Sequence, residues 1–242
     1  MLTVTTSDLT TVAREVDTVN MVRDAPAQDG DDGRGYHHGN LREALIDAGV
    51  ELARTGGPNA VLLRAASREA GVSHNAGYRH FANQEDLLGA VADRCMTELS
   101  LLMIERMKQV TVRNPVRRAQ ERLRAIGRAY IDFARGEPGW FRTAFSSARH
   151  DSDTPARDVP PGPDTAVDAV PGPFDVLNAR LDELVDVGAM TPERRVGAEY
   201  AAWASVHGVS SLLLDGPLRD LPESEVEHVI AAVLSVTNRG LE

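Results

Sequence analysis

The sequence has little of several residue types, and each scarcity excludes a class of protein. It contains one cysteine, Cys95, so no disulfide can form within the chain and no cysteine-based zinc site fits. No apolar run approaches the ~20 residues of a membrane span, and no secretion signal is recognisable. We therefore expect a cytoplasmic protein that does not enter a membrane. We interpret Cys95 as a small buried apolar residue; a thiol sensor is the alternative.

Lysine is nearly absent as well: Lys108 is the only one, and arginine supplies the remaining positive charge. The formal net charge of −10 argues against a protein that coats nucleic acid without specificity. The net charge does not exclude DNA binding, because binding depends on the local charge of the face that contacts DNA. A hydrophobic fraction of 42% over 242 residues supports one large domain or two modest ones.

Apolar residues recur at helical spacing in successive segments, and no segment shows strand alternation with a hairpin turn. The sequence therefore predicts an all-α fold. We interpret residues 1–34 as a disordered leader and residues 148–173, which hold six prolines and five aspartates, as a flexible loop. The expected helices lie at about 40–55, 62–70, 73–80, 83–110, 115–136, 138–147, 174–187, 192–214 and 222–238.

Helix-start signals support these ranges. Asn40 and Glu43 have the spacing of a capping box, and Ser73 and Asn83 are expected to cap the helices that follow them. Proline follows Asn114 and Thr191 at the first helical position, where it is favoured.

The most informative segment is 71–81, in which a glycine turn precedes a short capped helix with polar side chains. With the helix at 62–70 it has the arrangement of a helix-turn-helix, whose second helix enters the major groove of DNA. Asn75 can pair with adenine, and His74 can donate to guanine or to a phosphate. Tyr78 and His80 suit phosphate contacts, and Ser73 can touch a base or a phosphate as well as cap the helix. We expect Ala76 to be small because the two helices cross closely.

Five stretches of this region together resemble the N-terminal domain of the tetracycline-repressor (TetR) family. They are Tyr36-His37-His38-Gly39-Asn40-Leu41-Arg42, Leu63-Arg64, Arg68-Glu69-Ala70-Gly71-Val72-Ser73, Tyr78-Arg79-His80-Phe81 and Glu85-Asp86-Leu87-Leu88. The resemblance implies a DNA-binding domain at 35–86, in which Arg64 contacts the DNA backbone, and a ligand-binding and dimerisation domain at 87–242. It also implies a dimeric regulator, usually a repressor, that a small-molecule effector releases from a palindromic operator in double-stranded DNA.

Two segments near the C-terminus fit the dimer that the resemblance implies. The segment at 192–214 is rich in small residues, which let helices approach closely, and the segment at 222–238 presents a wide apolar stripe. Two such helices from each subunit can form a four-helix homodimer interface. The alternative is that both stripes only close the core of the monomer.

Residues 203–208 resemble a C-terminal subgroup of the family that carries Trp and His-Gly in this helix. Trp203 and His207 are four residues apart and share a face. With other aromatic residues they can line an apolar pocket with one polar handle for a small apolar effector. Ordinary core packing is the alternative. The ligand-binding candidates are Phe133, Trp140, Phe141, Phe145, Trp203 and His207.

We find no nucleophile–base pairing, phosphate loop or metal cluster with usable spacing, and we expect neither an enzyme nor a cofactor. The alternative function is an all-α ligand-binding or interaction protein with weak or lost DNA binding. Gln84 stands where the family usually has a phosphate-binding lysine, and residues 36–86 carry five arginines against six acids. We therefore expect DNA binding that is weaker or more salt-sensitive than in a typical member.

Overall fold

The computed structural model describes residues 38–146 and 170–241, with side chains from residue 41 onward. These ranges are helical and contain no strand, which confirms the predicted all-α fold. The predicted leader at 1–34 lies outside the described residues, as does the predicted loop at 148–173 except for its last four residues. The helices are α1 (His38–Gly56), the short η1 (Pro58–Ala60), α2 (Leu63–Glu69), α3 (His74–Gly77), α4 (Gln84–Lys108), α5 (Pro115–Gly136), α6 (Pro138–Ala144), α7 (Pro173–Asp186), α8 (Pro192–Arg195), α9 (Ala198–Leu214) and α10 (Glu223–Leu241).

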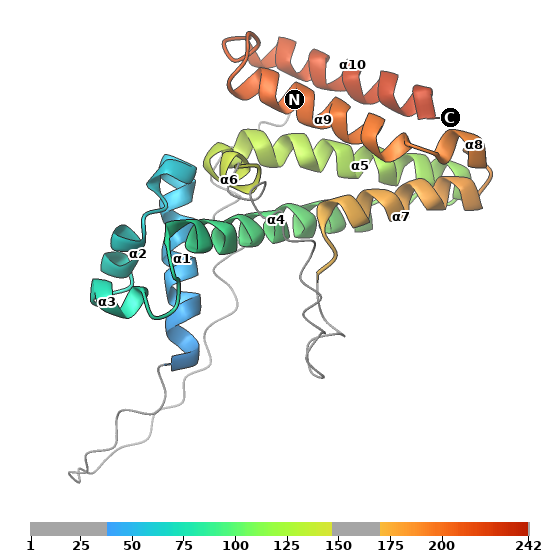
Figure 1. Ribbon diagram of the computed structural model, residues 1–242. Helices are drawn as coiled ribbons and strands as arrows, with labels where there is room; N and C mark the ends of the chain where they lie inside the picture. Colours follow the sequence, from blue (N-terminus) through green and yellow to red (C-terminus); the bar gives the residue numbers. More distant parts are fainter. Residues whose placement is uncertain (1–37, 147–169, 242) are drawn as a thin grey trace, which may run out of the picture. The chain divides into compact units, whose positions relative to one another are not determined.

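Helices α1, α2 and α3 pack with the first turns of α4 around one hydrophobic cluster (Figure 1). Leu45 of α1 and Leu87 of α4 are fully buried in it, and Phe81 fills the space after α3. Cys95 is buried in the same cluster, and burial raises the pKa of its thiol to about 12. The thiol therefore stays protonated at neutral pH, which fits the interpretation of Cys95 as an apolar residue.

The turn between α2 and α3 follows the sequence signals. Gly71 has a φ of 69°, in the left-handed region that glycine enters without strain. The Ser73 hydroxyl accepts a hydrogen bond from the backbone N–H of Ala76 at 3.3 Å. Asn83 Oδ1 accepts from the backbone N–H of Asp86 at 2.8 Å. Both predicted N-caps are thus confirmed.

The remaining helices pack around a second hydrophobic cluster. Helix α5 contacts α4, α7, α9 and α10, and α9 and α10 run side by side (Figure 1). The guanidinium of Arg128 on α5 donates to both carboxylate oxygens of Glu227 on α10, at 2.7 and 2.9 Å, which fixes α10 against α5. None of the described helices has both the length and the apolar character needed to cross a membrane.

Several predicted helix boundaries are wrong. Helix α1 begins at His38, so Asn40 lies inside its first turn and is not the N-cap. The helix predicted at 192–214 is broken into α8 and α9, because Gly197 adopts a φ of 77° that no right-handed helix contains. The last helix also extends three residues beyond 238, to Leu241.

Candidate DNA-binding helix and aromatic cluster

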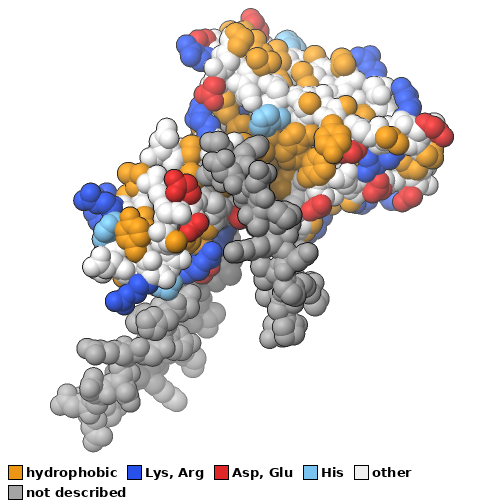
Figure 2. All heavy atoms as spheres, viewed as in Figure 1, with side chains coloured by type: hydrophobic (Ala, Val, Ile, Leu, Met, Phe, Trp, Pro, Cys, Tyr) orange, Lys and Arg blue, Asp and Glu red, His pale blue; other side chains and the backbone are white. Residues whose placement is uncertain are grey.

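The side chains selected for DNA contact lie together on the outside of the α2–α3 unit. Ser73, His74 and Asn75 are exposed at the start of α3, and Arg64 is exposed in the first turn of α2. Tyr78 is 49% exposed, and its ring meets that of His74 edge-on at a centroid distance of 4.6 Å. His80 is half-buried. Figure 2 shows Arg and His side chains gathered at the left of the view, over α2 and α3.

Gly77 sets how closely α3 approaches α2. A Cβ at this position would lie 2.5 Å from Ser67 Oγ and 3.3 Å from Leu63 Cδ1, both on α2. Ala76, the residue expected to sit at this crossing, is only half-buried. The close approach therefore belongs to Gly77, and this packing explains a glycine inside a helix where it lowers stability by about 1 kcal/mol.

Gly77→Val should displace α3 from α2. We expect the free energy of unfolding to fall by about 2 kcal/mol, because an overpacked contact forces neighbouring side chains and backbone to shift. DNA affinity should fall with it. The matched control is Gly89→Val on α4, where an added Cβ meets nothing within 4 Å. Urea unfolding of both variants measures the difference; equal stability for the two would contradict this account of Gly77.

Four of the six candidate ligand-binding side chains meet in one aromatic cluster. Phe141 and Phe145 of the α6 region lie with their ring centroids 5.5 and 4.8 Å from that of His207. The Phe145 and Trp203 centroids are 5.9 Å apart. Tyr130 of α5 stands among them, 5.3 Å from Trp203 and 5.8 Å from Phe141 by ring centroids. We call these five residues the aromatic cluster.

Sequence reasoning missed Tyr130 as a member of this cluster. It stands on the apolar stripe of α5, and a buried tyrosine hydroxyl needs a hydrogen-bond partner, which was the available signal. The partner is His207: the Tyr130 hydroxyl lies 2.8 Å from His207 Nδ1. The sequence could not identify this partner, because His207 lies 77 residues further along the chain and only the tertiary packing brings the two side chains together.

The pKa shifts of Tyr130 and His207 determine which of the two side chains carries the proton of this hydrogen bond. Burial raises the pKa of Tyr130 far above its usual range and lowers the pKa of His207. At neutral pH the phenol is therefore protonated and the imidazole neutral. The Tyr130 hydroxyl then donates to Nδ1, and His207 carries its ring proton on Nε2, where it can donate to an acceptor.

Phe133 and Trp140 lie elsewhere, where α6 packs on the end of α1. Trp140 Nε1 donates to the backbone carbonyl of Val50 at 2.9 Å, and the Arg54 guanidinium carbon lies 4.9 Å from the centroid of the Trp140 ring. Phe133 pairs with Trp140 at a centroid distance of 6.4 Å. These two side chains join α1 to α5 and α6 instead of completing the aromatic cluster.

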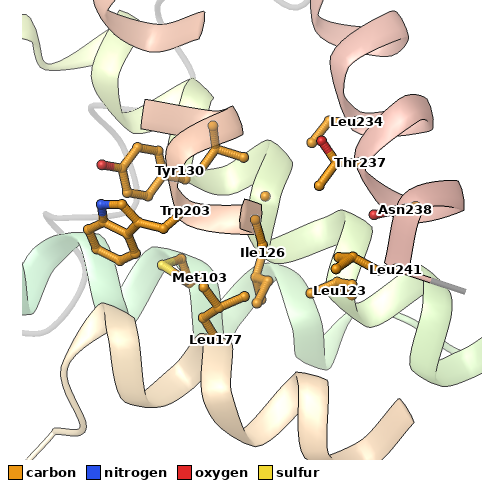
Figure 3. Close-up of a pocket in the computed structure, with 13 residues that line it drawn as sticks. Met103, Leu123, Ile126, Tyr130, Leu177, Trp203, Leu234, Thr237, Asn238 and Leu241 are labelled. Carbon is orange, nitrogen blue, oxygen red and sulfur yellow. The ribbon is translucent and has the colours of Figure 1, made fainter. Parts of the chain in front are cut away.

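A narrow cavity opens beside the aromatic cluster, lined by residues of α4, α5, α7, α9 and α10 (Figure 3). Its volume is about 30 Å³, enough for one or two water molecules. Tyr130 and Trp203 lie at one end of it, and Asn238 and Leu241 at the other (Figure 3). Within 38–146 and 170–241, no group of three His, Cys, Asp or Glu side chains could hold a metal ion.

Comparisons with known proteins match both halves of this structure. Residues 45–91 match the family described as bacterial regulatory proteins, tetR family. Residues 123–236 match the tetracyclin repressor-like C-terminal domain. Together the two matches cover more than half of the chain.

An uncharacterized HTH-type transcriptional regulator of Bacillus subtilis, YobS, is 27% identical over 116 residues, 48% of this chain and 56% of the relative. The chain thus spans little more than half the length of that relative. A protein of unknown function from Rhodococcus sp. RHA1 is 25% identical, with a TM-score of 0.59, covering 86% of this chain and 99% of the other.

A TetR variant from Acinetobacter baumannii AYE, in complex with minocycline, superimposes with a TM-score of 0.51 at 16% identity, covering 82% of this chain and 93% of the other. At that identity the likeness concerns the fold alone. The fold, the helix-turn-helix and both family matches agree: this chain belongs to the TetR family of bacterial regulatory proteins.

Proposed function

We propose that the chain is a non-catalytic, dimeric repressor, which a small-molecule effector releases from a palindromic operator. In this proposal residues 35–86 bind DNA and residues 87–242 bind the effector and the second subunit. The observation that carries it is the outer face of α3, where polar side chains are exposed while Gly77 holds the helix tightly against α2. A rigid support of this kind lets a short helix present its side chains in a fixed register.

The DNA-contacting side chains divide by chemistry. Asn75 suits bidentate pairing with adenine, and His74 suits guanine or a phosphate. Arg64, Tyr78 and His80 suit phosphates, which fix the register of the protein on the duplex. The edge-on contact between His74 and Tyr78 limits the freedom of both rings before DNA arrives.

The second subunit would cover an apolar groove on α9 and α10. Leu212 is 43% exposed and Val236 is 62% exposed, and both line this groove with Val229, Val233 and Gly208. Side chains of this kind are unfavourable in water and suit an interface with an identical surface. A two-fold dimer would hold two α3 helices at a fixed separation, as successive major grooves of DNA require.

Helix α6 offers a route from the effector to the DNA-binding unit. Its Phe141 belongs to the aromatic cluster, and its Trp140 donates to α1. Glu137, at the start of α6, forms an ion pair with Arg54 of α1. An effector that spreads the aromatic rings would therefore shift α6 and α1 together, and α4, which contacts both, would move with them. Because the effector would bind this shifted arrangement more tightly than the DNA-binding arrangement, it would lower the affinity of the protein for DNA.

Selection from a randomised DNA library, followed by footprinting, tests this proposal. We expect a protected palindrome. Asn75→Ala should relax the preference at one base pair of each half-site, with a loss of about 1–3 kcal/mol for the preferred sequence. Tyr78→Phe should weaken binding to all sequences alike if the hydroxyl contacts a phosphate. If no palindrome is selected, the chain is an interaction protein that has lost DNA binding.

A further inference from the structure

The amide of Asn238 is the unexplained polar group of the narrow cavity. Asn238 lies on α10, is only 8% exposed, and lines the cavity at the end opposite Tyr130 and Trp203 (Figure 3). Its side chain forms no hydrogen bond within the described part of the chain. Burying an amide without a partner is unfavourable, so the Asn238 amide suits a ligand that completes its bonding inside the cavity.

No charged side chain is among the described residues that line this cavity. Apart from Asn238, the lining consists of apolar side chains together with Gly127, Thr237 and Tyr130. The Tyr130 hydroxyl is already bonded to His207 Nδ1 at 2.8 Å. A carboxylate or an ammonium group would lose its hydration here and find no opposite charge, which is strongly unfavourable. The cavity therefore suits an uncharged molecule.

The chemistry of the Asn238 amide selects the polar end of the ligand. Its NH₂ group donates and its carbonyl oxygen accepts, so a ligand group that offers an acceptor and a donor side by side can form two hydrogen bonds with it. A carboxamide or a lactam has this pattern, whereas a ketone or an ester only accepts. Because most of the lining is apolar, the remainder of the ligand is expected to be hydrocarbon.

The second half of α10 is the wall that can move to admit such a molecule. The cavity of about 30 Å³ holds only one or two water molecules, so a ligand has to widen it. Arg128 of α5 holds the start of α10 through Glu227. From residue 228 to residue 241, the described part of α10 forms no ion pair, and the apolar side chains of Leu234 and Leu241 line the cavity. Displacing this half of the helix therefore breaks no ion pair.

We propose that the narrow cavity binds an uncharged, mainly hydrocarbon molecule whose terminal carboxamide or lactam group pairs with the Asn238 amide. This inference rests on the proposed function, in that such a molecule is the effector. The hydrocarbon end of the molecule lies toward Tyr130 and Trp203, which belong to the aromatic cluster. Thr237 lines both the narrow cavity and the groove between α9 and α10, so a ligand that moves this part of α10 also changes the surface offered to the second subunit.

Fluorine NMR of the full chain labelled with fluorotryptophan tests the inference with three probes of one shape. Hexanamide, methyl pentyl ketone and hexanoate share a pentyl chain on a carbonyl carbon, which also carries an amino group, a methyl group or a charged oxygen. Each probe that binds should shift the Trp203 resonance, which Trp203→Phe assigns. We expect hexanamide to bind most tightly, the ketone about five-fold more weakly, and hexanoate at least about ten-fold more weakly.

Asn238→Leu tests the polar end of the site. Because it replaces the amide by a hydrocarbon group of similar size, hexanamide should lose its advantage over the ketone, while the ketone still binds. This variant should be at least as stable to heat as the parent, because the amide has no partner in the protein. The control is Asn178→Leu on α7, whose amide donates to the Phe174 carbonyl and accepts from Arg195. It should lower the thermal stability and leave the order of the probes unchanged.

Gly127→Ala tests the location of the site, since it narrows the cavity from α5. An added Cβ would lie 3.0 Å from Leu234 Cδ2 and 3.5 Å from Val206 Cγ1. We expect hexanamide and the ketone to bind at least about three-fold more weakly, because less space is left for either. The control is Gly136→Ala on the same helix, where an added Cβ meets nothing within 4 Å and the affinities should not change.

Equal or tighter binding of hexanoate, or a preference for hexanamide that persists in Asn238→Leu, would overturn the inference. So would the absence of binding by all three probes, or a marked loss of stability in Asn238→Leu. Operator binding, measured in parallel on the same protein without probes, separates the two claims. A protein that binds an operator but no probe retains the proposed function and loses this site. Binding of the probes in the expected order without an operator retains the site and removes the proposed function.

Discussion

Gly139→Ala should lower the free energy of unfolding by about 3 kcal/mol, a large effect for a single added methyl group. A Cβ at Gly139 would lie 2.2 Å from the carbonyl oxygen of Ala53 and 2.3 Å from that of Arg54. Both atoms belong to the backbone of α1, which cannot rotate away as a side chain does. The substitution therefore has to push α6 off α1.

Gly136→Ala is the matched control, three residues earlier. Gly136 is exposed at the end of α5, and an added Cβ meets nothing within 4 Å. Alanine is the better helix former, so this variant should be as stable as the parent or slightly more so. Thermal and urea unfolding measure both variants. If Gly139→Ala unfolds together with the control, α6 is not held against α1 in the way described.

The Gly139→Ala variant also tests the proposed coupling of the effector site to the DNA-binding unit through α6. Moving this helix strains the hydrogen bond from Trp140 to Val50 and the ion pair between Arg54 and Glu137. We expect weakened operator binding at temperatures where the variant is still folded, because α1 packs against α2, which in turn contacts α3.

The double substitution Leu212→Glu and Val236→Glu should give a folded monomer that binds its operator about 100-fold more weakly. Both side chains are exposed in a single subunit, so the change leaves the core of that subunit intact. In a dimer the carboxylates would be buried without partners, which is strongly unfavourable. Loss of the second DNA-binding unit removes the gain from two linked contacts, which is commonly at least about 100-fold.

Tyr200→Glu is the control for this result. Tyr200 is 68% exposed and apolar in character but does not line the α9–α10 groove. Sedimentation velocity should find this variant dimeric, with normal operator affinity. A double variant that remains dimeric would place the subunit interface elsewhere and remove the support for the spacing of the two α3 helices.

Much of the DNA-binding unit was predictable from the sequence because its signals are local. Ser73 and Asn83 cap helices within three residues of themselves, and Gly71 turns the chain where it stands. The break at Gly197 was missed because Thr191 and Pro192 signal a helix start, and a glycine inside a helical pattern is often tolerated.

The sequence by itself determined the all-α fold and the helix-turn-helix, since these depend on residues within a few turns of one another. Only the tertiary structure decided what each face meets. It separated Trp140 from the candidate pocket by joining it to Val50, 90 residues away, and it brought Tyr130 to His207 across 77 residues. Periodicity shows that a side chain is buried but carries no information about its partner, because many distant residues offer an equally apolar surface.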